Sequence, residues 1–135
     1  MHILGIDHGD VRIGLALSDE TGTIAKPLQI IKHTARAADA AAVADIAARH
    51  GVKRIVIGLP TDDDGQIGHQ GCKVQRWAEA LRAATTIPIE FWDESLSSVE
   101  AEESRQAKRG RRGQPIDAEA AAFMLQSYLD AHRPT

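Results

Sequence analysis

The sequence predicts an α/β fold with a mixed five-stranded sheet and helices on both of its faces. Three short apolar segments near the amino terminus are joined by glycine-containing turns, which is typical of an antiparallel meander. Alanine-rich segments with helical spacing then alternate with short apolar segments, as in parallel crossover units. The resulting order is βββαβαβαα. Because such crossovers are right-handed, we expect one sheet covered by helices on each side.

The meander comprises strands expected at residues 2–7, 12–18 and 23–32. Pro27 lies within the third of these segments and cannot donate a backbone hydrogen bond to a neighbouring strand. We therefore expect the third strand at an edge of the sheet, or with a bulge at this proline.

The alternating part of the chain begins with an alanine-rich helix expected at residues 36–50. Residues 53–58 are almost wholly apolar, which is typical of a strand buried on both faces of a parallel sheet. A second helix contains Trp77, which we expect in the core, and a fifth strand follows at residues 87–92.

Two more helices complete the predicted order. Ser97 and Glu100 form a capping-box pattern at the start of one, and Asp117 lies where the last helix begins. Between them, residues 108–115 contain two glycines and a proline, so we expect irregular backbone there.

Length and composition limit the class of protein. A chain of 135 residues that is 43% hydrophobic suits a single domain over residues 1–135 with its own core. Cys72 is the only cysteine, which excludes an intramolecular disulfide and favours a reducing compartment. Neither a signal peptide nor an apolar segment of bilayer length is evident, so we expect a cytoplasmic protein with no membrane contact.

Acidic side chains follow the ends of predicted elements. Asp7 follows the first strand, Asp93 and Glu94 follow the fifth, and Asp117 opens the last helix. If the first, fourth and fifth strands are parallel neighbours, the carboxylates after them lie at one edge of the sheet. Such a cluster without histidine or cysteine favours Mg²⁺ or Mn²⁺. Two such ions can activate water and stabilise the leaving oxygen of a phosphodiester, so the pattern indicates a nuclease.

Each carboxylate also has a purely structural explanation. Asp7 is followed closely by Gly9, which is ordinary turn chemistry, and Asp117 has the residue type and place of a helix N-cap. Asp93 and Glu94 would point to opposite sides of a continuing strand, so we expect only one of them in the site.

A basic segment near the carboxyl-terminal part of the chain offers contacts to phosphates. With a net charge of −3, the chain as a whole does not attract nucleic acid, so binding requires a local patch. The alternative is a solvated surface loop. The segment contains Arg105, Lys108, Arg109, Arg111 and Arg112.

Four ordered blocks carry a resemblance to a known family. They are GIDHGDVRIGLALSD at 5–19, IVIGLPTDDDG at 55–65, FWDESLSS at 91–98 and IDAEAAAFMLQSYL at 116–129. Together they make the chain similar to the YqgF/RuvX family of RNase H-like proteins, which is associated with pre-16S rRNA cleavage or Holliday junction resolution.

The resemblance implies an RNase H-like fold and a divalent-metal site. By position, Asp7, Glu94 and Asp117 correspond to the catalytic carboxylates and metal ligands, with Asp93 as the other candidate ligand in the acidic pair. Arg12 matches a motif arginine and is expected to contact a phosphate. The chain departs from the family's usual residues at three positions, namely His8, Asp10 and Ser95.

The sequence thus predicts a metal-dependent nuclease acting on structured nucleic acid, and the resemblance favours the 5′ end of pre-16S rRNA. A Holliday junction resolvase would use the same site but requires a symmetric dimer, so monomer and homodimer both remain open. A third alternative is a nucleic-acid-binding module that has lost the chemistry.

Overall fold

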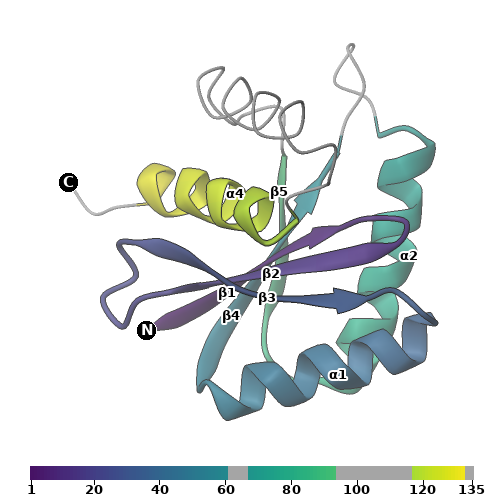
Figure 1. Ribbon diagram of the computed structural model, residues 1–135, viewed down its shortest axis with the longest axis horizontal. Coiled ribbons are helices and arrows are strands. Elements are labelled where there is room, and N and C mark those ends of the chain that lie inside the picture. The colour runs from purple at the N-terminus through teal and green to yellow at the C-terminus, as the bar shows by residue number, and fades with distance from the viewer. Residues whose placement is uncertain (61–66, 94–116, 133–135) are drawn as a thin grey trace.

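The computed structural model describes residues 1–60, 67–93 and 117–132. The expected helix at Ser97 and the basic segment lie outside these residues. Figure 1 shows the described elements, which form five strands and three helices. In chain order they are β1 (His2–His8), β2 (Arg12–Ser18), β3 (Ala25–Lys32), α1 (Arg36–Arg49), β4 (Val52–Leu59), α2 (His69–Ala84), β5 (Ile89–Asp93) and α4 (Asp117–Ala131).

The strands form one mixed sheet in the order β3-β2-β1-β4-β5. Strand β1 pairs antiparallel with β2 and parallel with β4, and β4 pairs parallel with β5. The expected mixed five-stranded sheet is therefore confirmed. The carboxyl ends of β1, β4 and β5 lie at the same edge, which we call the carboxyl edge of the sheet.

Strand β3 is the edge strand at the other end of the strand order from β5, and among the described strands it pairs with β2 alone. Its register against β2 shifts between Leu15 and Ala16, where Ala16 pairs with Pro27. The expected edge position and irregularity at this proline are both confirmed. A proline at an edge strand leaves no ladder donor unpaired inside the sheet.

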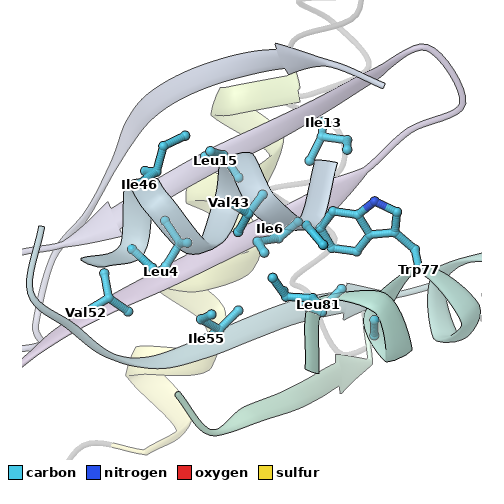
Figure 2. Close-up of a cluster of buried hydrophobic side chains, with 14 of the residues drawn as sticks. Leu4, Ile6, Ile13, Leu15, Val43, Ile46, Val52, Ile55, Trp77 and Leu81 are labelled. Atoms are coloured by element: carbon cyan, nitrogen blue, oxygen red, sulfur yellow. The ribbon is translucent and has the colours of Figure 1, made fainter. Parts of the chain in front are cut away.

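Helices α1 and α2 cover one face of the sheet and α4 covers the other (Figure 1). In Figure 2, Val43 and Ile46 of α1 lie over Leu4 and Leu15, and Trp77 of α2 lies beside them in the same core. The Trp77 side chain is only 1% exposed, which confirms it as a core residue.

The core on the α4 face is built around a close approach of helix and strand. A Cβ atom added at Gly5 of β1 would lie 2.8 Å from the Cβ of Leu125, so α4 packs directly against the strand backbone. Farther along α4, the Gln126 side chain accepts a hydrogen bond from the Ala25 backbone at 2.9 Å and donates one to the Thr23 carbonyl. Figure 1 shows α4 running antiparallel to β1, so the helix begins toward the carboxyl edge.

Candidate active site

Asp7 lies near the end of the central strand β1, on the face that α4 covers. It pairs with Gly14 of β2, and the register of β1 with β4 places Gly58 on its other side. Strand alternation gives Asp7 the same face as Gly5, whose neighbour is Leu125 of α4. Both flanking residues are glycines, so the positions directly paired with this half-buried carboxylate on β2 and β4 carry no side chain.

The start of α4 lies on the same side of the sheet as Asp7. Asp117 begins this helix eight residues before Leu125, a distance of ~12 Å along the helix axis. From Gly5, which faces Leu125, Asp7 lies ~7 Å farther along β1 toward the carboxyl edge. The backbone therefore brings the first turn of α4 and the end of β1 toward one region, although the Asp117 side chain is outside the described set.

Strand β5 presents its two final residues to opposite faces. Trp92 packs edge-to-face on Tyr128 of α4, with ring centroids 5.5 Å apart, so it lies on the face of Asp7. Alternation gives Asp93 the opposite face, shared with Phe91, which packs on the core of α1 and α2. Glu94, the next residue, lies outside the described residues.

Arg12 lies on the same side of the sheet as Asp7. It is the exposed first residue of β2, and alternation places it on the face of Gly14, the partner of Asp7. Its backbone carbonyl accepts a hydrogen bond from the Gly9 backbone at 2.9 Å, which closes the turn after β1. A Cβ at Gly9 would lie 2.7 Å from this carbonyl oxygen, so the turn needs glycine there.

The described part of the site fits a hydrated divalent cation. A half-buried carboxylate at the end of the strand supplies a hard oxygen ligand of the kind that Mg²⁺ and Mn²⁺ prefer. Among residues 1–60, 67–93 and 117–132, no group of three histidine, cysteine or acidic side chains is placed to hold a metal. Of the predicted carboxylates, only Asp7 has a described side chain on the α4 face.

His8 points to the other face of the sheet, where it contacts a buried polar network. Its ring lies 5.1 Å from that of His33 and 5.2 Å from that of Trp77, between centroids. Both ring nitrogens are enclosed and lack a hydrogen-bond partner among the described residues. Burial and the neighbouring His33 lower the pKa of His8, which favours the neutral ring.

Asp39 is the centre of this network, and it is only 2% exposed. Its carboxylate contacts the His33 ring nitrogen, and it accepts hydrogen bonds from the Thr34 backbone at 3.1 Å and from the Trp77 indole at 3.1 Å. Burial acts to raise the pKa of Asp39, but the hydrogen bonds from Thr34, His33 and Trp77 outweigh it, and the net pKa is below the usual value.

A pocket of about 380 Å³ opens beside this network, between the start of α1 and α2. Most of its charged lining residues are cationic. Arg36, Lys73 and Arg76 are cationic lining residues that no sequence motif marks. Lys73 and Arg76 are three residues apart on one helix, which is a weak signal, and only the fold brings Arg36 to them. The lining residues are His8, Asp10, His33, Arg36, Lys73, Arg76 and Trp77.

None of the helices within the described ranges is long and apolar enough to cross a membrane.

Comparisons with known proteins identify the family. The model of the RuvX family, described as Holliday junction resolvase, matches residues 1–131. A protein of Caldanaerobacter subterraneus subsp. tengcongensis named "Putative pre-16S rRNA nuclease" is 41% identical, over 98% of this chain and 99% of that relative. A relative of the same name from Anaeromyxobacter dehalogenans (strain 2CP-C) is 43% identical, over 99% of this chain and all of the relative.

A solved structure shows the same fold. Thermus thermophilus RuvC, in complex with its Holliday junction substrate, superimposes with a TM-score of 0.66 and 17% identity, covering 97% of this chain and 94% of RuvC. The sheet with α1 and α2 on one face and α4 on the other is thus the RNase H-like arrangement that the sequence resemblance implied. By the match over almost its whole length and by its relatives, the chain belongs to the RuvX family of nucleases.

Proposed function

We propose that this protein hydrolyses phosphodiester bonds of structured nucleic acid with the help of Mg²⁺ or Mn²⁺. The observation that carries the proposal is the placement of Asp7 at the carboxyl edge, flanked by two glycines and on the face covered by α4, in a RuvX-family chain. This edge is where open α/β sheets bind their ligands.

We assign the metal ligands to Asp7, Glu94 and Asp117. Asp93 is the weaker candidate because alternation along β5 gives it the face opposite Asp7, whereas a strand continued by one residue would return Glu94 to the face of Asp7. When bound, divalent ions at such carboxylates activate a water molecule and stabilise the leaving oxygen of the phosphodiester.

The protein's basic side chains then bind and orient the substrate. Arg12 is exposed on the face of Asp7 and is assigned to a phosphate near the cleaved bond. The basic segment is assigned to sequence-independent contacts with the nucleic-acid backbone. It consists of Arg105, Lys108, Arg109, Arg111 and Arg112.

The favoured substrate is the 5′ end of pre-16S rRNA. This choice is supported by the names of relatives that are 41% and 43% identical over nearly their whole length. A four-way DNA junction is the second candidate, because the matching family model carries the description Holliday junction resolvase. Resolution of a junction would need a homodimer that presents two sites, whereas rRNA cleavage is compatible with a monomer.

One assay tests both substrates. Purified protein is incubated with labelled pre-16S RNA or with a four-way DNA junction, in EDTA and in Mn²⁺. We expect cleavage only with metal, and a loss of about 100-fold or more for Asp7→Asn, because a neutral amide is a poor ligand for a hard cation. Asp45→Asn makes the same chemical change on the exposed surface of α1 and should leave the rate unchanged.

The same assay separates the two residues of the acidic pair. Glu94→Gln should reduce cleavage about as much as Asp7→Asn, whereas Asp93→Asn should retain most of the activity. Cleavage at the wild-type rate by Asp7→Asn would refute the proposed function, and an inactive Asp93→Asn beside an active Glu94→Gln would reverse the ligand assignment.

A further inference from the structure

We propose that the pocket between α1 and α2 binds a phosphate group and, in the proposed nuclease, holds a backbone phosphate of the nucleic acid. This pocket lies on the face of the sheet opposite Asp7, at the same carboxyl edge. The second part of the proposal rests on the proposed function, whereas the binding of phosphate does not.

Three cationic side chains from two helices line the pocket. Arg36 is the first residue of α1, and Lys73 and Arg76 lie three residues apart on α2, so both face the same side of that helix. Among the described residues, neither arginine has a carboxylate within ion-pair distance. Lys73 contacts Asp10 at 3.5 Å, and Asp10 supplies the one carboxylate among the lining residues.

The buried Asp39 reduces this positive charge without outweighing it. Its carboxylate is only 2% exposed and accepts hydrogen bonds from Thr34 and Trp77, and Arg36, Lys73 and Arg76 outnumber the two carboxylates Asp39 and Asp10. The start of α1 adds the partial positive charge of a helix amino terminus beside Arg36. The pocket is therefore locally basic although the chain carries a net charge of −3.

The chemistry of the lining argues against a metal ion and against a stacked base as the ligand. Three cations repel a metal ion, so the histidines here do not form a metal site. Trp77 is 1% exposed and offers no open ring face for stacking on a base. An anion with several acceptor oxygens matches guanidinium and ammonium donors, and a volume of about 380 Å³ is within the range of small-ligand sites.

The position of the pocket relates it to the candidate active site. His8, in the pocket lining, directly follows Asp7 in β1, and the two side chains alternate across the end of the strand. A nucleic-acid strand that crosses the carboxyl edge therefore passes Asp7 on one face and the cations on the other. Holding a second phosphate would fix the strand relative to the carboxylates.

The test measures binding without cleavage. A fluorescent single-stranded oligonucleotide is titrated in EDTA at several salt concentrations, and anisotropy gives the binding constant. For Arg36→Gln/Arg76→Gln we expect binding about threefold to tenfold weaker, and a slope of log K against log salt smaller by about 0.7, as for one lost phosphate contact. Circular dichroism confirms that the variant is folded.

A matched double variant controls for the loss of charge. Arg49→Gln/Arg82→Gln also removes one arginine from α1 and one from α2, but these arginines pair with Asp45 and Glu79 outside the pocket. This control should keep the salt slope of the wild type. Equal losses in both double variants would mean that only overall charge matters, which would overturn the proposal.

Inorganic phosphate distinguishes the two sources of the ligand. It is titrated into the wild type and both double variants while the ring resonances of His8 and His33 are followed by NMR. A phosphate site is supported by saturable resonance shifts that occur in the wild type and in Arg49→Gln/Arg82→Gln but not in Arg36→Gln/Arg76→Gln. If the salt slope of that variant is unchanged, these shifts assign the site to free phosphate and overturn the backbone assignment. No shift and an unchanged slope would overturn the proposal entirely.

The proposed function fails independently. The cleavage rate of Asp7→Asn in Mn²⁺ tests the metal site, whereas oligonucleotide binding by the arginine variants in EDTA tests the pocket on the other face. Wild-type cleavage by Asp7→Asn would refute the metal-site assignment, whereas the salt slopes of the arginine variants would still decide the fate of the pocket.

Discussion

Asp39 shows how a single buried charge is tolerated in this protein. An uncompensated carboxylate in the core would be costly, but here backbone, imidazole and indole groups all donate to it. In the sequence, Asp39 is one acid in an alanine-rich helix and cannot be told from a surface residue. Its role depends on Trp77, which only the packing of α1 on α2 brings within reach.

Replacing this carboxylate tests its contribution to stability. We expect Asp39→Asn to lower the free energy of unfolding by about 2–3 kcal/mol, since an amide has one acceptor oxygen and leaves buried donors unpaired. Urea denaturation gives the difference. Asp45→Asn, on the exposed side of α1, should change stability by less than about 0.5 kcal/mol. Equal effects would show that the network adds nothing.

The lowered pKa of Asp19 predicts that the free energy of unfolding depends on pH in acid. Hydrogen bonds from the Thr23 backbone, the Thr21 hydroxyl and the Ile24 backbone lower the pKa of Asp19 to about 2. Its folded pKa lies below the unfolded value of about 3.9, so its contribution is present above pH 4 and is lost as the pH falls toward 2. Urea denaturation from pH 6 to pH 2 should show a smaller decline for Asp19→Asn than for the wild type. Identical pH profiles would contradict this assignment.

At the scale of elements, the docking of α4 on β1 depends on Gly5. A methyl group there would lie 2.8 Å from the Leu125 Cβ, and neither backbone can yield without moving the helix. We expect Gly5→Ala to destabilise the protein by about 1–3 kcal/mol and to reduce cleavage in conditions where the protein stays folded, because α4 carries Asp117.

Gly68→Ala is the matched control for this substitution. A Cβ at Gly68 meets no atom within 4 Å, and the backbone φ of −89° suits alanine. Thermal unfolding and the cleavage rate should both remain near those of the wild type. If Gly5→Ala behaved like Gly68→Ala in both measurements, α4 would not set the geometry of the site.

Most element positions followed from local patterns. The observed strands and α1 begin and end within two residues of their expected bounds, because apolar alternation and glycine turns act over short distances. Assigning Asp93 or Glu94 to the site depends instead on which face of the sheet each side chain points to, and this changes with every residue along the strand. Strand β5 ends at Asp93, one residue beyond the expected end. The pocket cations could not be predicted, because Arg36 and Arg76 line one pocket only after α1 packs on α2.

At the scale of the molecule, one sheet separates two apolar cores. Leu4 and Ile6 contribute to the core under α1 and α2, while Ile3 contributes to the core under α4, so β1 belongs to both. Because successive side chains of β1 point into different cores, the unfolding of one core is coupled to that of the other. A single domain over residues 1–135 stays a prediction, and it has a thermodynamic test.

Calorimetry supplies this test. We expect one unfolding transition in which the van't Hoff and calorimetric enthalpies agree, because neither core can be lost without the strands that build the other. A measured ratio of the two enthalpies near one would agree with this expectation. Two resolved transitions would show that the two faces unfold separately. So would a shoulder on the unfolding transition that changes only in variants of the α4 core.

The central position of β1 has a consequence for the order of events during synthesis. The strand that carries Asp7 is made before α4, and the hydrogen bond between Ala25 and Gln126 joins residues 101 positions apart. At 5–20 residues per second, that separation corresponds to about 5–20 s of translation. Through this interval the face that holds the carboxylate lacks its covering helix. A nascent chain thus acquires the shape needed to cut nucleic acid only after α4 has been made.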